Sequence, residues 1–370
     1  MSVIGYKYRI YPNKTQQQFF QQMFGSCRFV YNYFLEKSSE NYKTDKEKFS
    51  FTSCCKELTL LKNQYLWLKD CDAVALQQSL RDLEKSYHRF FNKISKFPKF
   101  HSKKNRKQSY RTVNNSIRSI IRIQDNFIRL PKVGFVKAKI SRKHQGNILN
   151  AVISQNNDGK YYCSICCTDV NFTPFPNTGN NIGIDLGIVD FAITSDGTKI
   201  PNLRFYENAQ GKIAKLQNDL SRKTIGSNRW NKARIKLAKA HKHIVNQRLD
   251  FLHKLTTKLA KEYDIICIED LDIKNMKETN NSSHNKRVVD VSWYEFRTML
   301  QYKTQWYGKQ LVIINRFYPS SQICHICNFN SGKKEVTVRH WKCPHCHNEL
   351  DRDINAAINI LNEGLHNIVK

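Results

Sequence analysis

The chain opens with alternating apolar and polar residues, a pattern that predicts a strand over Val3–Tyr11. Pro12 ends this strand, and the capping-box pattern Asn13-Lys-Thr-Gln16 predicts the start of a helix. Apolar residues then recur every three or four positions in two segments, which indicates the buried faces of two helices. These residues are Phe20, Met23, Cys27, Val30 and Phe34 in the first helix, and Leu76, Leu80, Leu83, Tyr87 and Phe90 in the second. We therefore expect one strand followed by a small helical unit.

Short alternating segments follow the helices, separated by Pro, Gly and Asn-Asp-Gly turns, and they predict strands. They cover residues 126–130, 134–140, 148–154 and 161–167. Short strands at this spacing are typical of a small β-barrel, which we place around residues 113–175. Residues 172–180 contain two prolines and several polar side chains, so we interpret them as a linker.

The second half of the chain has the order β-β-β-α-β-α-β-insert-α. A strand within residues 181–187 starts a three-strand meander that continues over 191–194 and 199–205. The remaining elements are helices over 209–220 and 228–261, a strand that ends at Glu269, a loop over 275–289, a helix over 292–307 with Trp293, Phe296 and Leu300 inward, and a strand over 311–315. This order matches a ribonuclease-H-like α/β core, in which acids from the first strand, a later strand and a C-terminal helix converge.

The composition bounds the size and the partners of the protein. Its 370 residues, 40% of them hydrophobic, are enough for two or three packed domains. The 61 Lys and Arg against 31 Asp and Glu give a net charge of +30, which favours a phosphate backbone as partner over a membrane surface. The sequence contains no run of 18 apolar residues and no secretory segment, so we expect no membrane span. The 12 cysteines then indicate a reducing compartment, the cytoplasm, with association to the nucleoid in a prokaryote.

Two segments concentrate the positive charge. Residues 93–143 contain 16 Lys and Arg and one acid, Asp125, and aromatic residues are interleaved with the basic ones over 97–111. Lys and Arg can follow phosphates while Phe and Tyr stack on bases, so this segment predicts nucleic-acid binding, with a solvated basic loop as the alternative. Residues 212–258 contain 13 Lys and Arg and two acids, which indicates either a solvated helix face or a track for a nucleic-acid backbone.

The most specific local pattern is Cys324-x2-Cys327-x15-Cys343-x2-Cys346. Two Cys-x-x-Cys pairs at this spacing can place four thiolates around one Zn²⁺. Because four thiolates complete the shell and leave no position for a substrate, we predict a structural zinc site. The segment is too short to bury a core of its own, so metal binding should supply its folding free energy.

Other residues of metal-binding type are expected not to be ligands. His325, His345 and His347 lie inside the two pairs, whose four thiolates already complete the shell. Cys163 and Cys166 have the Cys-x-x-Cys spacing, but no second pair is near them in the sequence. Strand alternation therefore explains these two cysteines better than metal binding does.

Three acids, Asp185, Glu269 and Asp353, stand in unusual settings for charged side chains. Asp185 lies in a short apolar strand between Gly183 and Gly187, which allow a close approach to the backbone. Glu269 ends an apolar run, and Asp353 opens a helical segment. Carboxylates favour Mg²⁺ or Mn²⁺, and two such ions about 4 Å apart support phosphodiester hydrolysis. We predict that the three acids are catalytic and bind these ions.

Asp351 competes with Asp353 for the third position of this site. We prefer Asp353 because it directly precedes the apolar face Ile354, Ala357, Ile358 and Leu361. Asp351 is expected to cap the helix or to support the site from outside, and Arg352 to neutralise one of the two acids.

These motifs, in this order, resemble the TnpB family, also called OrfB of insertion sequences. The resemblance rests on Gly-Ile-Asp185-Leu-Gly, Ile-Glu269-Asp-Leu, Pro319-Ser-Ser-Gln-Ile-Cys-x-x-Cys, Cys-Pro-x-Cys and Asp353-x-Asn-Ala-Ala. The segments Tyr8-Arg-Ile-Tyr-Pro12, Leu76-Gln-Gln-Ser-Leu80 and Phe97-Pro-Lys-Phe100 are similar to the same family, so the resemblance covers nearly the whole chain. Gln322, where Lys is frequent, and Asn328, where Gly is frequent, depart from the family pattern without touching an expected ligand.

The resemblance implies a multidomain α/β protein with a RuvC-type nuclease core of the ribonuclease-H-like fold, ancestral to type V CRISPR effectors. Residues 1–12 and 94–175 would form a wedge domain, interrupted by a helical recognition domain over 13–93. The RuvC core would consist of residues 176–318 and 349–370, with a zinc-binding insert over 319–348. By similarity, Asp185, Glu269 and Asp353 would be the catalytic acids.

The family further implies a guide RNA from the transposon end and a double-stranded DNA target, cut beside a short motif that the protein reads. Gln77, Gln78 and the polar residues near 112–115 are candidates for reading that motif. Three alternatives are a guide-dependent DNA-binding repressor without cleavage, a transposase that joins DNA strands, and a zinc-dependent nucleic-acid-binding protein without enzymatic role. The presence of all three acids favours the nuclease, and the oligomeric state is left open.

Overall fold

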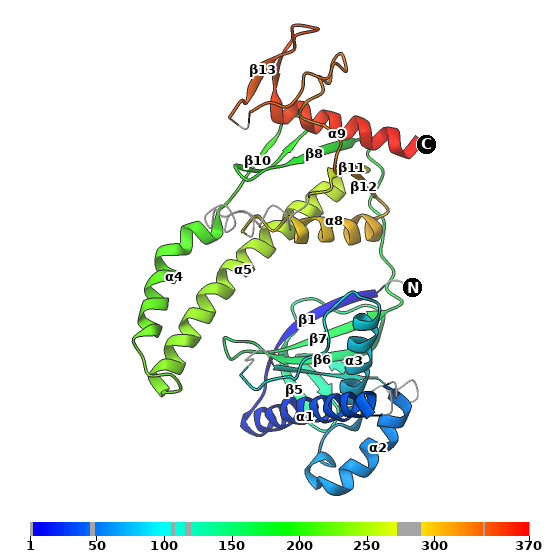
Figure 1. Ribbon diagram of the computed structural model, residues 1–370, viewed down its shortest axis with the longest axis vertical. Helices are drawn as coiled ribbons and strands as arrows, with labels where there is room; N and C mark the ends of the chain where they lie inside the picture. The colour runs from blue at the N-terminus through cyan, green and yellow to red at the C-terminus, as the bar shows by residue number, and fades with distance from the viewer. Residues whose placement is uncertain are drawn as a thin grey trace. The chain divides into compact units, whose positions relative to one another are not determined.

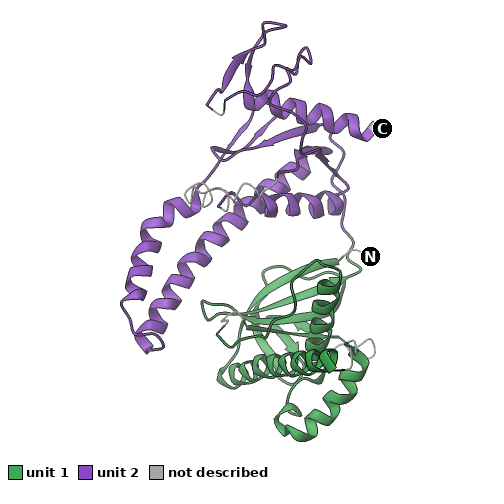
Figure 2. Cartoon of the chain, viewed as in Figure 1, with its two compact units in different colours: residues 1–171 green, residues 172–370 purple. Residues whose placement is uncertain are grey.

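The structure, a computed structural model, describes residues 3–44, 49–104, 108–114, 120–271, 290–335 and 337–369. The chain divides into two compact units, residues 1–171 and 172–370, shown in Figures 1 and 2. Each unit contains a β-sheet with helices packed against it (Figure 1). The three predicted catalytic acids and the four predicted zinc ligands all lie in the second unit.

A seven-stranded antiparallel sheet organises the first unit, in the order β2-β6-β7-β1-β5-β4-β3. Its strands are β1 (Val3–Tyr11), β2 (Gln108–Val113), β3 (Arg122–Gln124), β4 (Phe127–Leu130), β5 (Gly134–Lys139), β6 (Asn147–Gln155) and β7 (Tyr161–Thr168). Every second residue of β1 is buried, as its alternation predicts. The sequence pattern does not predict β2 and β3, which are the edges of the sheet. No pairing joins these edges among the described residues, so the predicted barrel is an open sheet there.

The helices of the first unit are α1 (Lys14–Thr44), α2 (Phe51–Gln64), the short 3-10 helix η1 (Leu66–Leu68) and α3 (Ala73–Phe91). The predicted capping box is confirmed, because Asn13 Oδ1 accepts from the Gln16 N–H at 2.8 Å and Gln16 Oε1 accepts from the Asn13 N–H at 3.1 Å. The predicted stripes of α1 and α3 are buried, except that Phe90 is half-buried. α2 is an addition to the prediction.

A five-stranded sheet organises the second unit, in the order β10-β9-β8-β11-β12. Its strands are β8 (Asn181–Leu186), β9 (Asp190–Thr194), β10 (Lys199–Pro201), β11 (Ile265–Glu269) and β12 (Gln310–Ile314). β8, β11 and β12 are parallel, and β9 and β10 form the predicted antiparallel meander with β8. This mixture of parallel and antiparallel strands follows the order of strands and helices that the sequence predicts for the second half of the chain.

Helices cover both faces of this sheet (Figure 1). Ile266 and Ile268 of β11 share a core with Leu252 of α5 (Asn228–Glu262) and Phe296 of α8 (Trp293–Tyr307). Cys267, which points the opposite way, packs against α9 (Arg352–Val369). A further helix, α4 (Phe205–Ser221), forms a hairpin with α5. No helix in the described part of the chain combines the length and the apolar character needed to cross a membrane.

The third strand of the meander is shorter than predicted. β10 ends at Pro201 instead of residue 205, and α4 begins at Phe205 instead of residue 209. A polar turn occupies the difference: the Asn202 amide donates to the Ile188 backbone oxygen, and its side-chain oxygen accepts from the Arg204 N–H. The predicted loop over 275–289 lies outside the described residues.

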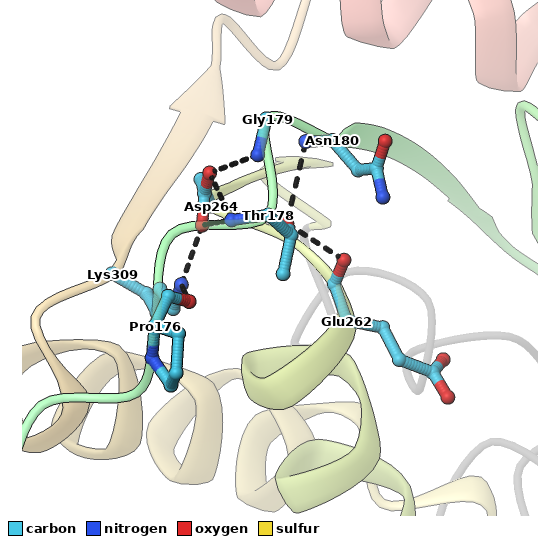
Figure 3. A network of polar contacts seen from close by, with 7 residues as sticks. All are labelled: Pro176, Thr178, Gly179, Asn180, Glu262, Asp264 and Lys309. Carbon is cyan, nitrogen blue, oxygen red and sulfur yellow. Dashed lines mark hydrogen bonds and ion pairs between the residues drawn. The ribbon is translucent and has the colours of Figure 1, made fainter.

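The predicted linker is fixed to the second unit, as Figure 3 shows. Asp264, just before β11, accepts from the backbone N–H groups of Thr178 and Gly179 and pairs with the fully buried Lys309. These donors lower the pKa of the Asp264 carboxyl to about 2, with the Lys309 hydrogen bond as the largest contribution. The ring of Phe175 also stacks on Tyr307, with centroids 4.0 Å apart. The predicted linker is therefore packed against the second unit and is not a free connection.

Candidate active site and metal centre

The period of two along the strands directs two of the predicted acids to one face of the sheet. In β11, Ile268 belongs to the core on the α5 side and Cys267 packs against α9, so Glu269 points to the α9 side. The parallel register places Gly183 of β8 beside Cys267. Asp185, two residues after Gly183, therefore faces the same side. Neighbouring strands thus direct Asp185 and Glu269 toward α9, the helix that carries Asp353 in its first turn.

α9 approaches β8 closely because Gly183 has no side chain. A Cβ atom at Gly183 would lie 2.1 Å from the Ala357 backbone oxygen and 2.7 Å from the Leu361 backbone nitrogen. These are distances that no real Cβ atom tolerates, so only glycine fits here. The sequence predicts that another group comes close to the backbone at this glycine. That group is α9, the helix that carries Asp353.

The carboxyl groups of Asp185 and Glu269 lie close enough to affect each other's pKa. Burial raises the pKa of Asp185 well above its usual range, and the negative charges of Glu269 and Asp353 raise it further. Burial also raises the pKa of Glu269. Both acids therefore resist ionisation at this place, and a nearby cation would relieve that cost.

Asp351 caps α9, one of the two roles that its position predicts. It ends β14 (Glu349–Asp351), and its Oδ1 accepts from the backbone N–H groups of Asp353 at 2.9 Å and Ile354 at 3.1 Å. Its other oxygen pairs with Lys199 at 2.8 Å. Both oxygens of Asp351 therefore have partners in the fold, and the charge that raises the pKa of Asp185 is that of Asp353.

The cation that neutralises Asp353 is Arg339, at 2.7 Å, and not the expected Arg352. Arg339 belongs to the segment between the two Cys-x-x-Cys pairs, and sequence reasoning missed it because nothing in its neighbourhood predicts contact with an acid 14 residues away. Arg352 donates to the Glu335 backbone oxygen at 2.8 Å, and its charge lowers the pKa of Asp185. Two arginines therefore balance part of the negative charge of the acid cluster.

The donor set of the acid cluster fits a hard divalent cation. Its three carboxyl groups offer only oxygen ligands, which hard cations prefer. The raised pKa of Asp185 means that this carboxyl is unstable as an anion until a positive charge comes near. A divalent cation bound by the acids would remove that penalty.

The four cysteines of the sequence pattern converge as predicted. Their sulfur atoms all lie within 4.8 Å of one another, and the pairs Cys324–Cys346 and Cys327–Cys343 are both 3.7 Å apart. A tetrahedron of thiolates at a Zn–S distance of about 2.3 Å has edges of about 3.8 Å, so these separations suit zinc. Among the described residues, only these four His, Cys, Asp or Glu side chains form a group whose ligand atoms all lie within 4.8 Å of one another. The carboxylate oxygens of Asp185, Glu269 and Asp353 face the same region but do not all come that close to one another.

The backbone of each Cys-x-x-Cys pair forms the same hydrogen-bonded turn. The Asn328 N–H donates to the Cys324 oxygen, and the His347 N–H donates to the Cys343 oxygen, both at 2.9 Å. Asn328 and His347 have φ values of 60° and 59°, in the left-handed region. Asparagine is one of the few residues other than glycine that adopts this region readily, which explains why Asn328 can replace the frequent Gly.

The expected non-ligands lie outside this group. His325 contacts Asn355, and His345 stacks on Phe329 with ring centroids 5.5 Å apart. Cys163 is fully buried in β7, where alternate residues face the core, and burial raises the pKa of its thiol to about 12. A thiol of this kind is a core residue and a poor metal ligand.

The buried face of α9 differs from the predicted one. Ala357 is buried, but Ile354, Ile358 and Leu361 are only half-buried. The buried positions are Asn355, Ala356, Ala357, Asn359 and Ile360. The buried face therefore includes two polar residues, Asn355 and Asn359, where apolar ones are expected. Their amide groups donate to backbone carbonyls of residues 319–350, which we call the four-cysteine segment. The signal available in the sequence was the Asn-x3-Asn repeat in an otherwise apolar helix.

The candidate readers of the DNA motif lie in the first unit. Gln78 lines a cavity of about 460 Å³, and Gln77 is exposed. Thr112 is buried and donates to Asp72 at 2.6 Å, and Asn114 bonds to the backbone of a neighbouring segment, so both side chains are used inside the fold. Residue 115 lies outside the described residues. The role of Gln77 and Gln78 stays a prediction.

The aromatic residues of the basic segment are accessible in the first unit. Phe97 and Phe100 are 45% and 61% exposed, within a stretch that has no regular secondary structure. His101 stacks on Tyr31 of α1, with ring centroids 3.9 Å apart, and so fixes this stretch to the helix. Exposed rings next to lysines are the arrangement that base stacking and phosphate contacts require.

Three family models match parts of the chain. Residues 164–280 match a model described as a probable transposase of the IS605 OrfB type, and residues 1–47 match the helix-turn-helix domain of the same group. Residues 293–360, which include the four cysteines and Asp353, match the TNB domain of Cas12f1-like proteins.

Curated relatives cover nearly the whole chain. A "Putative RNA-guided DNA endonuclease" of Streptomyces pristinaespiralis is 36% identical over 366 residues, which are 98% of this chain and 89% of that protein. The "Putative RNA-guided DNA endonuclease InsQ" of Escherichia coli K12 is 33% identical over 376 residues, 97% of this chain and 92% of that protein.

Solved structures share the fold at low identity. A Cas12f1 protein, from a complex with single-guide RNA and target DNA, aligns with a TM-score of 0.59 at 13% identity over 95% of this chain and 84% of that one. The mini RNA-guided endonuclease Cas_phi3 aligns with a TM-score of 0.53 at 10% identity over 98% of this chain and 92% of that one.

Proposed function

Since the chain belongs to the TnpB family, also called OrfB of insertion sequences, we propose that it is an RNA-guided DNA endonuclease of a transposable element. The observation that carries the proposal is the arrangement of Asp185 and Glu269 on neighbouring parallel strands, facing the helix that begins with Asp353. The charges of Glu269 and Asp353 raise the pKa of Asp185, which agrees with this arrangement. The two full-length relatives described above bear the name RNA-guided DNA endonuclease, which supports the same activity here.

Asp185, Glu269 and Asp353 would be the catalytic acids and would hold Mg²⁺ or Mn²⁺. When bound there, a pair of these ions supplies an activated water and stabilises the leaving oxygen of the phosphodiester. Arg339, which pairs with Asp353, would contact a phosphate of the strand that is cut, because a guanidinium suits both carboxylate and phosphate.

Cys324, Cys327, Cys343 and Cys346 would hold Zn²⁺ with a full shell, so this zinc is structural. Residues 319–348 would then be a zinc insert in a RuvC core formed by 176–318 and 349–370. Residues 1–12 and 94–175 would form the wedge domain and 13–93 the recognition domain, all in the first unit except residues 172–175, which belong to the second. A guide RNA from the transposon end would read the target by base pairing, and the protein would read a short adjacent motif.

The test is cleavage of matched double-stranded DNA by the protein with its co-purified RNA, sequenced to identify the guide. We expect cleavage in Mg²⁺, none in EDTA, and a loss of about a thousandfold or more in Asp185→Ala, since several kcal/mol of metal-based stabilisation disappear. Target binding by Asp185→Ala should stay within about twofold. Asp250→Ala, at an exposed acid of α5, is the matched control and should cut like the wild type.

Two outcomes would favour a different function. Guide-dependent binding without cleavage by the wild type would favour the repressor, which uses the same RNA and DNA contacts without the acids. Joining of DNA strands by the RNA-free protein would favour the transposase. Cleavage that persists at the wild-type rate in Asp185→Ala would show that the acid cluster is not the active site.

A further inference from the structure

Two asparagines in the centre of the buried face of α9 have no role in the proposed chemistry. Asn355 and Asn359 are only 1% and 2% exposed, although asparagine is a poor helix former and its amide is costly to bury without partners. They are four residues apart, so they project from the same face of the helix. Polar side chains this deeply buried are kept in place by specific hydrogen bonds.

The partners of both asparagines belong to the turn that leads into the first Cys-x-x-Cys pair. The Asn359 amide donates to the Ser320 oxygen at 2.8 Å and to the Ile323 oxygen at 2.7 Å. The Asn355 amide also donates to the Ile323 oxygen at 2.7 Å, and its oxygen accepts from the His325 N–H at 3.0 Å. The residues on both sides of Cys324 are therefore bonded to α9.

The first turn of α9 is tied to the same segment at a second point. Asp353 pairs with Arg339, and the Arg352 N–H donates to the Arg339 backbone oxygen at 2.8 Å. On its other side, the helix lies directly on Gly183. The position of the Asp353 carboxyl is thus set jointly by the sheet and by the four-cysteine segment.

The four-cysteine segment has little core of its own to keep this surface folded. Its buried cluster contains Cys324, Cys343 and Leu350, with Cys327, Cys346 and Trp341 packed against it. Four of these six side chains are the predicted zinc ligands, so the fold of the segment depends on the metal. Without zinc, the carbonyls that accept from Asn355 and Asn359 would lose their fixed positions.

We propose that Asn355 and Asn359 are positioning residues that clamp the zinc-loaded segment onto α9, so that the divalent-ion affinity of the acid cluster depends on the loaded zinc centre. The inference rests on the proposed function, because it assigns a purpose to the placement of Asp353. The zinc contributes no chemistry to the cut and acts only through the clamp.

The test compares Asn355→Ala and Asn359→Ala with Asn362→Ala, an exposed asparagine of the same helix. Mn²⁺ binding is followed by electron paramagnetic resonance, and cleavage by single-turnover rates at saturating target. We expect the two clamp variants to need about 10 to 100 times more Mn²⁺ for half-saturation and to cut correspondingly slower, a loss as large as that from replacing a residue that holds a metal ligand in place. Zinc content should stay at one per chain and target affinity within about twofold, and Asn362→Ala should match the wild type.

Two further measurements keep the test decisive. Asn359→Ser retains a donor and is the milder variant if alanine prevents folding; it should give an intermediate shift in Mn²⁺ affinity. Removal of zinc from the wild-type protein with a zinc-selective chelator should weaken Mn²⁺ binding at the acids by at least about tenfold. Unchanged Mn²⁺ affinity in the folded variants, or in the zinc-free wild type, would overturn the clamp.

The two proposals fail in different ways. If the wild type binds Mn²⁺ at the acids but does not cut DNA, the endonuclease is wrong, and the clamp is still decided by the Mn²⁺ titrations. If the wild type cuts and the clamp variants cut equally well at low Mn²⁺, the clamp is wrong and the endonuclease stands.

Discussion

At the scale of single residues, the acid cluster depends on a glycine as much as on its acids. Asp185 and Glu269 meet because neighbouring parallel strands present them on one face, but Asp353 joins them only if α9 lies against β8. Gly183 permits that contact, since any side chain would enter the helix backbone. The function of this residue is therefore to bring together groups that are distant in the sequence.

Gly183→Ala should destabilise the second unit by about 3 kcal/mol or more, because the new methyl group would overlap backbone atoms that cannot move aside. Urea unfolding measures the change. The matched control is Gly211→Ala, at an open position of α4, which should stabilise by about 0.5–1 kcal/mol through its helix propensity. A Gly183→Ala variant as stable as the wild type would show that α9 does not press on β8.

The residues of the site differ in how far the sequence reveals them. Asp185, Glu269 and the four cysteines stand in spacings or apolar settings that indicate their chemistry by themselves. Arg339 and Asn355 do not, because their meaning comes from partners that only the folded insert supplies. The sequence also predicts an apolar face for α9, since nothing in a linear pattern indicates that Ser320 and Ile323 present carbonyl oxygens to it.

At the scale of elements, a buried lysine joins the two long helices that support the sheet. Lys303 of α8 is 5% exposed, and its ammonium group donates at 2.7 Å to the His253 oxygen and to the hydroxyls of Thr256 and Thr257 of α5. All three acceptors are uncharged. Burial therefore lowers the pKa of Lys303 from its ordinary 10.5 to about 8.

This pKa predicts how the stability of the helix pair depends on pH. Between about pH 8 and 10.5 the unfolded chain binds the proton of Lys303 and the folded chain does not, so wild-type stability gains from this group as pH rises. Lys303→Met lacks the effect. The stability of Lys303→Met relative to the wild type should thus fall by up to about 3 kcal/mol from pH 8 to pH 10.5.

Urea unfolding over this pH range, with Lys254→Met as the control, checks the prediction. Lys254 is exposed on α5, so its replacement controls for the loss of a lysine that is not buried. A pH-independent difference for Lys303→Met would contradict a depressed pKa.

The elements that sequence patterns predict well are those whose apolar period is long and regular. α1, α3, α5 and α8 agree with their predictions because each has several turns of one stripe. β2 and β3 are the edges of the first sheet and lie in a basic stretch, where charge hides the alternation. α2 was missed since its buried face consists of only three residues, Cys54, Leu58 and Leu61.

At the scale of the whole molecule, charge is the dominant property. The net charge of +30 is carried by both units, in the basic segment around Phe97–Phe100 and along α4 and α5. A chain with this excess attracts polyanions at long range, and the attraction is screened by salt. Nucleic acid, the partner that the proposed function requires, is such a polyanion.

RNA affinity should therefore fall by about a thousandfold or more between 50 and 200 mM salt, the loss expected when many phosphates are neutralised. Filter binding or fluorescence anisotropy at several salt concentrations gives the slope. Lys103→Gln combined with Lys104→Gln should reduce the slope by about one unit for each phosphate contact removed. A flat salt dependence would exclude the basic segments as the RNA track.

The central claim is that the three acids hold a pair of divalent ions where the DNA is cut. The most direct measurement is anomalous scattering from Mn²⁺ in crystals of the protein with its RNA and target DNA. The account predicts two Mn²⁺ peaks about 4 Å apart between the carboxyl groups of Asp185, Glu269 and Asp353. Peaks elsewhere, with these carboxyl groups free of metal, would contradict it.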